Sequence, residues 1–224
     1  MDWTAFRLSL SLALWTALLI VPTGVVIGRA LARRRGTGKA IIEALLLLPL
    51  VLPPTVLGYG LLMALAPSSG FGRLIASLAG GPLVFTFTGI LIASLIVNIP
   101  FAVQPIVRAF ESLPQSLGEA AAVSGLSPLQ TFWRIELPLV WPGIVTAIAL
   151  VVAHTLGEFG VILMIGGSIP GETQTLSIAL YDRVQAFRNA EAAVIAGVLV
   201  ITSLVALALV NWTARRTDPR RGRP

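Results

Sequence analysis

Cysteine is absent from this 224-residue sequence, and histidine occurs once, at His154. The lack of cysteine excludes disulfide bonds and thiolate metal sites, and a lone histidine argues against a conventional zinc site. Charge is also scarce, because 12% of the residues are charged and 56% are hydrophobic, with a mean hydropathy of +0.89. Such a chain cannot cover a water-facing surface, so the composition predicts a membrane protein. We identify no catalytic residues and no metal ligands.

A complete nucleotide-binding loop is missing as well. The stretch 36–39 resembles the end of a phosphate-binding loop, whose pattern requires glycine at position 33 and serine or threonine at position 40. The sequence has Arg33 and Ala40 at these positions instead. We therefore expect that the chain does not bind ATP through such a loop and is not an enzyme by itself.

The net charge of +6 comes from basic residues that lie beside the apolar runs. A basic chain can bind nucleic acid, but the positive-inside rule accounts for arginines in short loops at the ends of membrane spans. We therefore expect contact with membrane lipid and none with nucleic acid. The basic residues that mark the inner side are Arg29, Arg33, Arg34, Arg35, Lys39, Arg108, Arg215, Arg216, Arg220, Arg221 and Arg223.

Five apolar runs predict an all-α integral membrane protein with one transmembrane domain over residues 1–224. A helix rises about 1.5 Å per residue, so each run is long enough to cross a hydrocarbon core of about 30 Å. From the positions of the basic segments we expect the N-terminus outside and the C-terminus in the cytoplasm. The predicted spans are residues 8–28, 41–66, 83–107, 143–166 and 191–212.

Prolines interrupt two of the predicted spans. Pro53 and Pro54 lie in the second span, and Pro100 and Pro105 lie in the third. A proline frees backbone hydrogen-bonding groups that lipid cannot satisfy, so protein or water must lie beside it. We expect the second span to be a kinked helix, and the kink either lines a transport pathway or serves packing alone.

The fourth predicted span contains the residues that fit lipid least well, His154, Gly157, Glu158 and Gly160. A carboxylate at the bilayer centre costs about 2.5–3.5 kcal/mol. His154 and Glu158 are four residues apart, so they share one helix face and can interact. Glu158 either contacts substrate or fixes the packing near a gate, and we favour the second role because a carboxylate repels an anion.

The segment 166–175 that follows is rich in glycine and hydroxyl groups, including Thr173 and Thr175. Clustered backbone N–H groups and hydroxyls can hold an oxyanion, but a flexible turn before a surface helix explains the same composition. Our candidates for pathway or gate residues are Pro53, Pro54, His154, Gly157, Glu158, Gly160, Thr173 and Thr175.

Residues 111–142 form the longest polar segment between apolar runs. Ser112 and Gln115 have the spacing of a capping box, and Gly125 suits the left-handed turn that ends a helix. The pair Ser127–Pro128 then repeats a helix start, and we expect Pro138 to end the second helix. The segment therefore predicts two short helices joined by a tight corner, forming a knob at the membrane surface.

Part of this segment resembles the EAA loop of bacterial ABC importer permeases. The residues that carry the resemblance are Glu119, Ala120, Ala121, Gly125, Ile135, Leu137 and Pro138. The resemblance implies a type I importer permease fold, in which the loop is a knob seated in a cleft of a separate ATPase subunit. These residues would then couple ATP hydrolysis to the membrane helices. The chain itself would carry no cofactor, with ATP and magnesium bound on the partner ATPase.

Five further stretches, residues 48–54, 58–59, 156–160, 169–173 and 175–181, are similar to the molybdate-type branch of these permeases. This resemblance implies a homodimer in the bacterial inner membrane, with two ATPase subunits and an extracytoplasmic molybdate-binding protein. The expected function is ATP-driven import of molybdate, with tungstate as a further substrate.

Three alternatives remain. The substrate can instead be sulfate, thiosulfate or another oxyanion. A passive channel or secondary transporter would need no ATPase, and the knob argues against it. An intramembrane enzyme would have to rely on His154 and Glu158 alone, with no nucleophile or metal cluster nearby.

Overall fold

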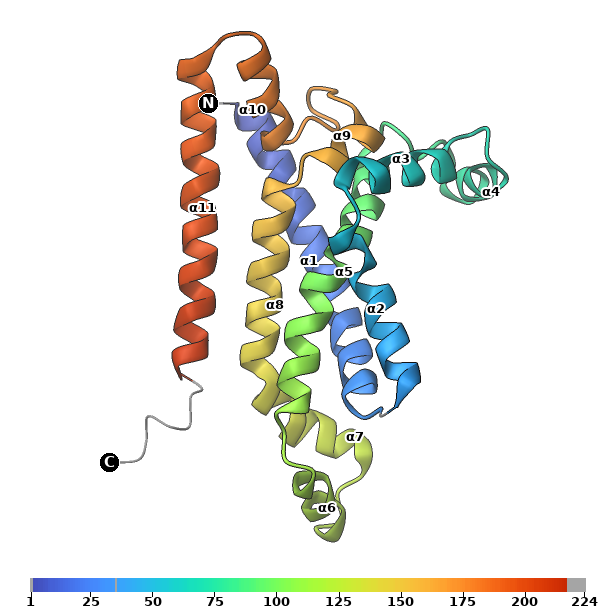
Figure 1. Cartoon of the computed structure of the whole chain (residues 1–224), viewed down its shortest axis with the longest axis vertical. Coiled ribbons are helices and arrows are strands. Elements are labelled where there is room, and N and C mark those ends of the chain that lie inside the picture. The colour runs from blue at the N-terminus through green and yellow to red at the C-terminus, as the bar shows by residue number, and fades with distance from the viewer. Residues whose placement is uncertain (1, 35, 217–224) are drawn as a thin grey trace.

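A computed structural model describes residues 2–34 and 36–216, and this part of the chain consists of helices and connecting turns without a strand (Figure 1). The all-α prediction is confirmed. The predicted basic positions Arg35, Arg220, Arg221 and Arg223 lie outside the described residues. The elements in chain order are α1 (Trp3–Ala32), α2 (Thr37–Val51), α3 (Pro54–Leu65), α4 (Gly70–Ala79), α5 (Phe87–Glu111), α6 (Ser116–Val123), α7 (Pro128–Thr131), the π-helical turn η1 (Phe132–Glu136), α8 (Leu137–Gly157), α9 (Gly160–Gly166), α10 (Leu176–Gln185) and α11 (Asn189–Arg216).

Four helical stretches of the described chain are long and apolar enough to cross a membrane. They are α1, α5, the continuous stretch Pro128–Gly157 that ends with α8, and Asn189–Leu209 of α11. The bent pair of α2 and α3 makes a fifth span if the two helices are counted together. In Figure 1, α6 and α7 lie at the end of the bundle opposite the start of α1, and α11 ends on the same side as α6 and α7.

The second predicted span is broken rather than kinked. α2 and α3 meet at an angle of 102°, and Leu52 and Pro53 between them have extended backbone, with ψ of 140° and 133°. A residue that precedes proline is driven out of the helical conformation, and two prolines in succession extend this effect to Pro53. Pro54 then occupies the first turn of α3, where its missing N–H costs nothing.

The third span, in contrast, is not interrupted. Pro100 and Pro105 both lie inside the continuous helix α5 and do not break it. Ala102 and Ile106, beside these prolines, belong to the core that α5 forms with α1 and α8. The prolines thus lie in a helix that packs against two others, a setting that tolerates freed backbone groups better than lipid does.

Small residues let the three core helices approach closely. A Cβ atom on Gly28 of α1 would lie 2.8 Å from Cγ2 of Ile106 in α5. A Cβ on Gly143 of α8 would lie 2.5 Å from Cβ of Ala109, also in α5. Close packing of this kind supplies much of the attraction between helices in lipid, where the hydrophobic effect does not act.

This packing predicts opposite effects of alanine at two glycines. Gly143→Ala forces a methyl group into Ala109 and should destabilise the fold by about 1–3 kcal/mol. Gly197→Ala in α11 meets no atom within 4 Å, so it should be neutral or stabilise by up to about 1 kcal/mol through helix propensity. Thermal unfolding in detergent measures both. Equal stabilities of the two variants would contradict the close packing of α5 on α8.

Candidate functional site

The polar segment 111–142 forms the expected pair of short helices, α6 and α7, with a tight corner between them. Gly125 at the corner has φ of 76°, the left-handed conformation that glycine adopts most easily. The N–H of Gly125 donates to the Ala122 carbonyl and the N–H of Leu126 donates to the Ala121 carbonyl, both at 3.0 Å. This pattern is a Schellman motif, so the prediction for Gly125 is confirmed.

The start of α7 also agrees with the sequence. Ser127 and Gln130 form a reciprocal capping box, in which each side chain accepts from the other residue's backbone N–H at 3.3 and 2.9 Å. Pro128 occupies the first turn, where its missing N–H costs nothing. The second helix of the knob therefore begins where its sequence predicts.

The first predicted capping box is wrong. Ser112 ends α5 instead of starting α6, and its hydroxyl donates to the Ala109 carbonyl at 2.8 Å. α6 begins only at Ser116, and Gln115 before it makes no side-chain cap. The reason is that α5 continues to Glu111, beyond the predicted end of the third span at residue 107, and takes Ser112 as its C-terminal cap.

Pro138 does not end the second helix, contrary to prediction. The turn η1 is π-helical, with the N–H of Leu137 donating to the Phe132 carbonyl, and it leads directly into α8. Pro138 falls in the first turn of α8, because the wider turn before it accommodates the proline without breaking the chain of helices. The fourth span is therefore continuous with α7, whereas α6 joins α5 through the non-helical residues 112–115.

The residues of the EAA pattern fall into an exposed group and an inward-facing group. Glu119, Ala120 and Gly125 are exposed on the knob, and Pro138 is exposed in the first turn of α8. Ala121 is 3% exposed. Ile135 and Leu137 are half-buried, and Leu137 packs against the apolar core. The exposed group is available to a partner, and the inward-facing group fixes the knob to the bundle.

Glu136, which the sequence analysis did not single out, is buried at the base of the knob. Its carboxylate is 2.5 Å from Nε of Arg29 and pairs with the guanidinium of Arg33 as well. A cavity of about 640 Å³ lies beside this cluster, between the knob and the ends of α1 and α5. A single carboxylate among apolar and basic residues was the only sequence signal for this site.

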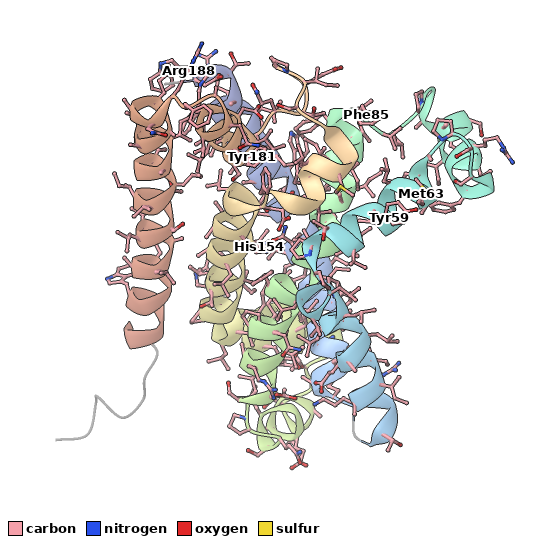
Figure 2. All side chains as sticks on the ribbon, turned by 45° about the horizontal axis from the view of Figure 1, so that its top comes forward. Tyr59, Met63, Phe85, His154, Tyr181 and Arg188 are labelled. Carbon is pink, nitrogen blue, oxygen red and sulfur yellow. The ribbon has the colours of Figure 1, made fainter. Side chains whose placement is uncertain are left out.

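The second irregular region lies within the membrane-spanning part, where two helix breaks meet. α8 ends at Gly157, residues 158 and 159 leave the helix, and α9 starts at Gly160. The predicted helix over 143–166 therefore ends nine residues early. A Cβ on Gly160 would lie 2.9 Å from Cβ of Pro54, so this break packs against the break between α2 and α3. Figure 2 shows His154 between the end of α8 and the start of α3.

Glu158 caps the short helix α9. Its side chain is 8% exposed and Oε2 lies 3.6 Å from Nε2 of His154, so the expected proximity of the two residues is present. Its other oxygen, Oε1, accepts the backbone N–H of Val161 at 3.0 Å. This arrangement favours a packing role for Glu158 over contact with an anion. Its place in a pathway or gate stays a prediction.

A chain of polar groups connects His154 to the interior of the bundle. Nδ1 of His154 lies 3.2 Å from Oδ1 of Asn98, and the Asn98 amide donates to the hydroxyl of Thr155 at 3.0 Å. The same amide donates to the Ser94 carbonyl, and the hydroxyl of Thr16 donates to that of Ser94. This connected set of polar groups was not predicted, because its members come from three different helices that are distant in the sequence.

The segment 166–175 is held by internal hydrogen bonds. The hydroxyl of Thr173 donates to the Gly166 carbonyl at 2.6 Å and accepts the N–H of Ile169 at 3.2 Å, so it closes the loop on itself. Thr175 precedes α10 and is 1% exposed. The helix that follows, α10, is buried at its start, residues 176–179, and exposed at Tyr181, Val184 and Gln185. These contacts favour a structural turn over an open oxyanion site.

The contacts of Glu158 predict its effect on stability. Glu158→Ala removes the cap of α9 and should lower the stability in detergent by about 1 kcal/mol, the usual cost of losing a helix cap. Glu158→Gln keeps an acceptor oxygen and should retain most of the stability. Glu172→Ala, at an exposed position of the adjacent loop, is the control. If Glu158→Ala unfolds at the same temperature as Glu172→Ala, then Glu158 does not hold the break.

Comparison with known proteins agrees with this geometry. The molybdenum transport system permease protein ModB of Azotobacter vinelandii is 44% identical over 215 residues, 96% of this chain and 95% of the relative. ModB of Escherichia coli K12 is 33% identical and covers 99% of this chain and 97% of its own. A crystal structure of a bacterial ABC transporter involved in the import of alginate matches with a TM-score of 0.70 at 18% identity, over 99% of this chain and 79% of that one.

The family model for the inner membrane component of binding-protein-dependent transport systems matches residues 20–223. This match covers most of the chain, and the relatives cover almost all of it. The fold, with a knob at one end of a bundle of long apolar helices, agrees with the sequence comparison. The chain belongs to the family of inner membrane permease components of binding-protein-dependent ABC importers.

Proposed function

We propose that this chain is the membrane subunit of an ATP-driven importer that moves molybdate into the cytoplasm. The observation that carries the proposal is the exposed knob of α6 and α7, whose second helix continues into the membrane span α8. A partner that moves the knob therefore acts on a membrane helix through the turn η1. The names of the near-full-length relatives support molybdate as the substrate.

The knob faces the cytoplasm in this proposal, with the N-terminus outside and the C-terminus inside. Four described basic residues form ion pairs at the knob end of the bundle, namely Arg29, Arg33, Lys39 and Arg108. Basic residues at this end agree with the positive-inside rule for a cytoplasmic side. Residues 1–224 then form one transmembrane domain, in which the bent pair of α2 and α3 counts as one span.

The partners follow from this arrangement. Two copies of the chain form the pathway, and each knob fits a cleft of one of two ATPase subunits, which bind ATP and magnesium. An extracytoplasmic binding protein delivers the anion to the opposite face. One similar solved structure is that of an alginate ABC transporter in complex with a pentasaccharide-bound periplasmic protein, which supports a delivery partner of this kind.

The exposed residues Glu119, Ala120 and Gly125 contact the ATPase in this proposal. Ile135 and Leu137 transmit its motion, because they lie where the knob enters α8. The transport pathway runs along the helix breaks, where Pro53, Pro54, His154, Gly157 and Gly160 lie. Irregular backbone at membrane depth is tolerated only inside protein or beside a water-filled cavity. A transport pathway that passes the breaks would supply water to their free backbone groups.

Sulfate is the second candidate substrate. A probable sulfate transport system permease of Nephroselmis olivacea is 31% identical over 209 residues, but these make up only 73% of its length. Molybdate and sulfate share tetrahedral shape and charge, so the two assignments predict the same kind of pathway.

The test of this function is ATP hydrolysis in liposomes that contain the chain, its ATPase and its binding protein, with molybdate and sulfate compared. Stimulation by molybdate alone supports the proposal. Stimulation by sulfate alone keeps the importer class and changes the substrate. A properly inserted complex with no stimulation by either anion contradicts the importer assignment.

Gly125 supplies a prediction about coupling. Gly125→Val puts a branched side chain at φ of 76°, a strained conformation that costs about 1–2 kcal/mol, and should reduce molybdate uptake to background while membrane insertion persists. Gly80→Val is the matched control, because Gly80 also has positive φ, and no atom lies within 4 Å of the Cβ position of either glycine. Gly80 lies after α4, outside the knob. Normal uptake by the Gly125 variant would show that the corner is not part of the coupling surface.

A further inference from the structure

The knob is joined to the membrane helices by two segments that lack regular α-helical hydrogen bonding. Residues 112–115 connect α5 to α6 without helical structure, and the π-helical turn η1 connects α7 to α8. A π turn departs from the usual hydrogen-bond ladder and is often found at functional sites. Unless such a joint is held, a force applied to the knob bends the joint and does not reach the membrane.

Arg29 of α1 holds this second joint on both sides. Its Nη2 donates to the carbonyl of Pro128 at the start of α7, at 3.3 Å. Its Nε donates to Glu136 at the end of η1, at 2.5 Å. The guanidinium also lies 4.7 Å from the ring centroid of Phe132, the first residue of η1. One side chain from a different helix thus contacts the residues before, at the start of and at the end of the π turn.

The carboxylate of Glu136 is the centre of this cluster. Its side chain is 8% exposed, and it accepts from both Arg29 and Arg33. A buried ion cluster is a poor source of stability, since an apolar group of the same size often stabilises as well, but removal of one partner leaves an uncompensated charge. Its geometric specificity is the better-supported benefit, because a planar guanidinium fixes direction as well as distance.

We propose that Glu136, Arg29 and Arg33 form an ionic clamp that locks the π turn and makes α1 move together with the knob. This inference rests on the proposed function, in which the knob receives the motion of an ATPase. Arg29 is the main arm because it spans the turn and its side chain is 24% exposed, whereas that of Arg33 is 56% exposed. These three residues are positioning residues and take no part in binding the substrate.

The functional test uses Glu136→Gln and counts the ATP hydrolysed per molybdate imported. The clamp predicts that the variant still binds the ATPase and hydrolyses ATP, while uptake per ATP falls about tenfold, within the usual range of coupling free energies. Arg29→Gln should behave in the same way, and Arg33→Gln should have a smaller effect. An unchanged ratio in Glu136→Gln, or an equal loss in both arginine variants, would overturn the proposal.

Glu111→Gln is the matched control. Glu111 is a half-buried carboxylate that, like Glu136, has two basic partners, here Lys39 of α2 and Arg108 of α5. Both partners lie outside the knob and η1, so these two ion pairs cross neither the link 112–115 nor the turn η1. The ATP ratio of the control should stay within twofold of the wild type, about 0.4 kcal/mol. A loss as large as that of Glu136→Gln would mean that any ion pair at this end has the same effect, and the clamp would be rejected.

A second measurement does not depend on the substrate. The chain has no cysteine, so spin labels can be attached to cysteines introduced at the exposed positions Arg34, beyond the end of α1, and Leu129, in α7. The distance between the labels is measured in the chain in lipid, and in the ATPase complex with and without ATP. The clamp predicts one narrow distribution that ATP does not shift, and a broader one when Glu136→Gln is added. Equal widths with and without Glu136→Gln contradict the clamp, even if no anion stimulates the complex.

Discussion

The need to satisfy every backbone hydrogen bond inside the protein governs this structure, because lipid offers no partner. Most of the bundle meets it with long continuous helices. α5 stays continuous although its two prolines leave backbone carbonyls without a helical donor. The two breaks at membrane depth pack against each other at Pro54 and Gly160. The side chain of Glu158 accepts the backbone N–H of Val161 in the first turn of α9. This hydrogen bond gives a structural reason for placing the carboxylate of Glu158 at membrane depth, where a charge is costly.

Backbone without helical hydrogen bonds costs less at the knob end of the bundle, because water and charged side chains can bind its free groups there. The knob leaves the bundle through a non-helical link and returns through a π turn. Arg29 of α1 and Arg33, which follows α1, pair with the buried Glu136 at the end of that turn. In the proposed function, the rigid bundle and this held joint are two parts of one device, since motion of an ATPase reaches the pathway only if neither part yields.

Local patterns were predictable from the sequence, and contacts between distant segments were not. The left-handed turn at Gly125 and the cap at Ser127 depend on a few neighbouring residues, so their sequence signals were sufficient. Apolar runs gave the class of fold and most of the spans. Ser112 did not start a helix because α5 extends to Glu111. Pro138 did not end one because the π turn before it allows the chain to continue into α8. Glu136 and Asn98 were missed because their partners lie on other helices.

The central claim, that the knob of α6 and α7 binds the ATPase, is tested most directly by finding which end of the bundle contacts that subunit. Val123 in α6 and Phe187 between α10 and α11 are both 90% exposed. Figure 1 shows α6 and the turn between α10 and α11 at opposite ends of the bundle. In a chain with no native cysteine, Val123→Cys and Phe187→Cys can be cross-linked separately in the assembled complex. The account predicts cross-links to the ATPase from position 123 and none from position 187. Cross-links from position 187 alone would contradict it.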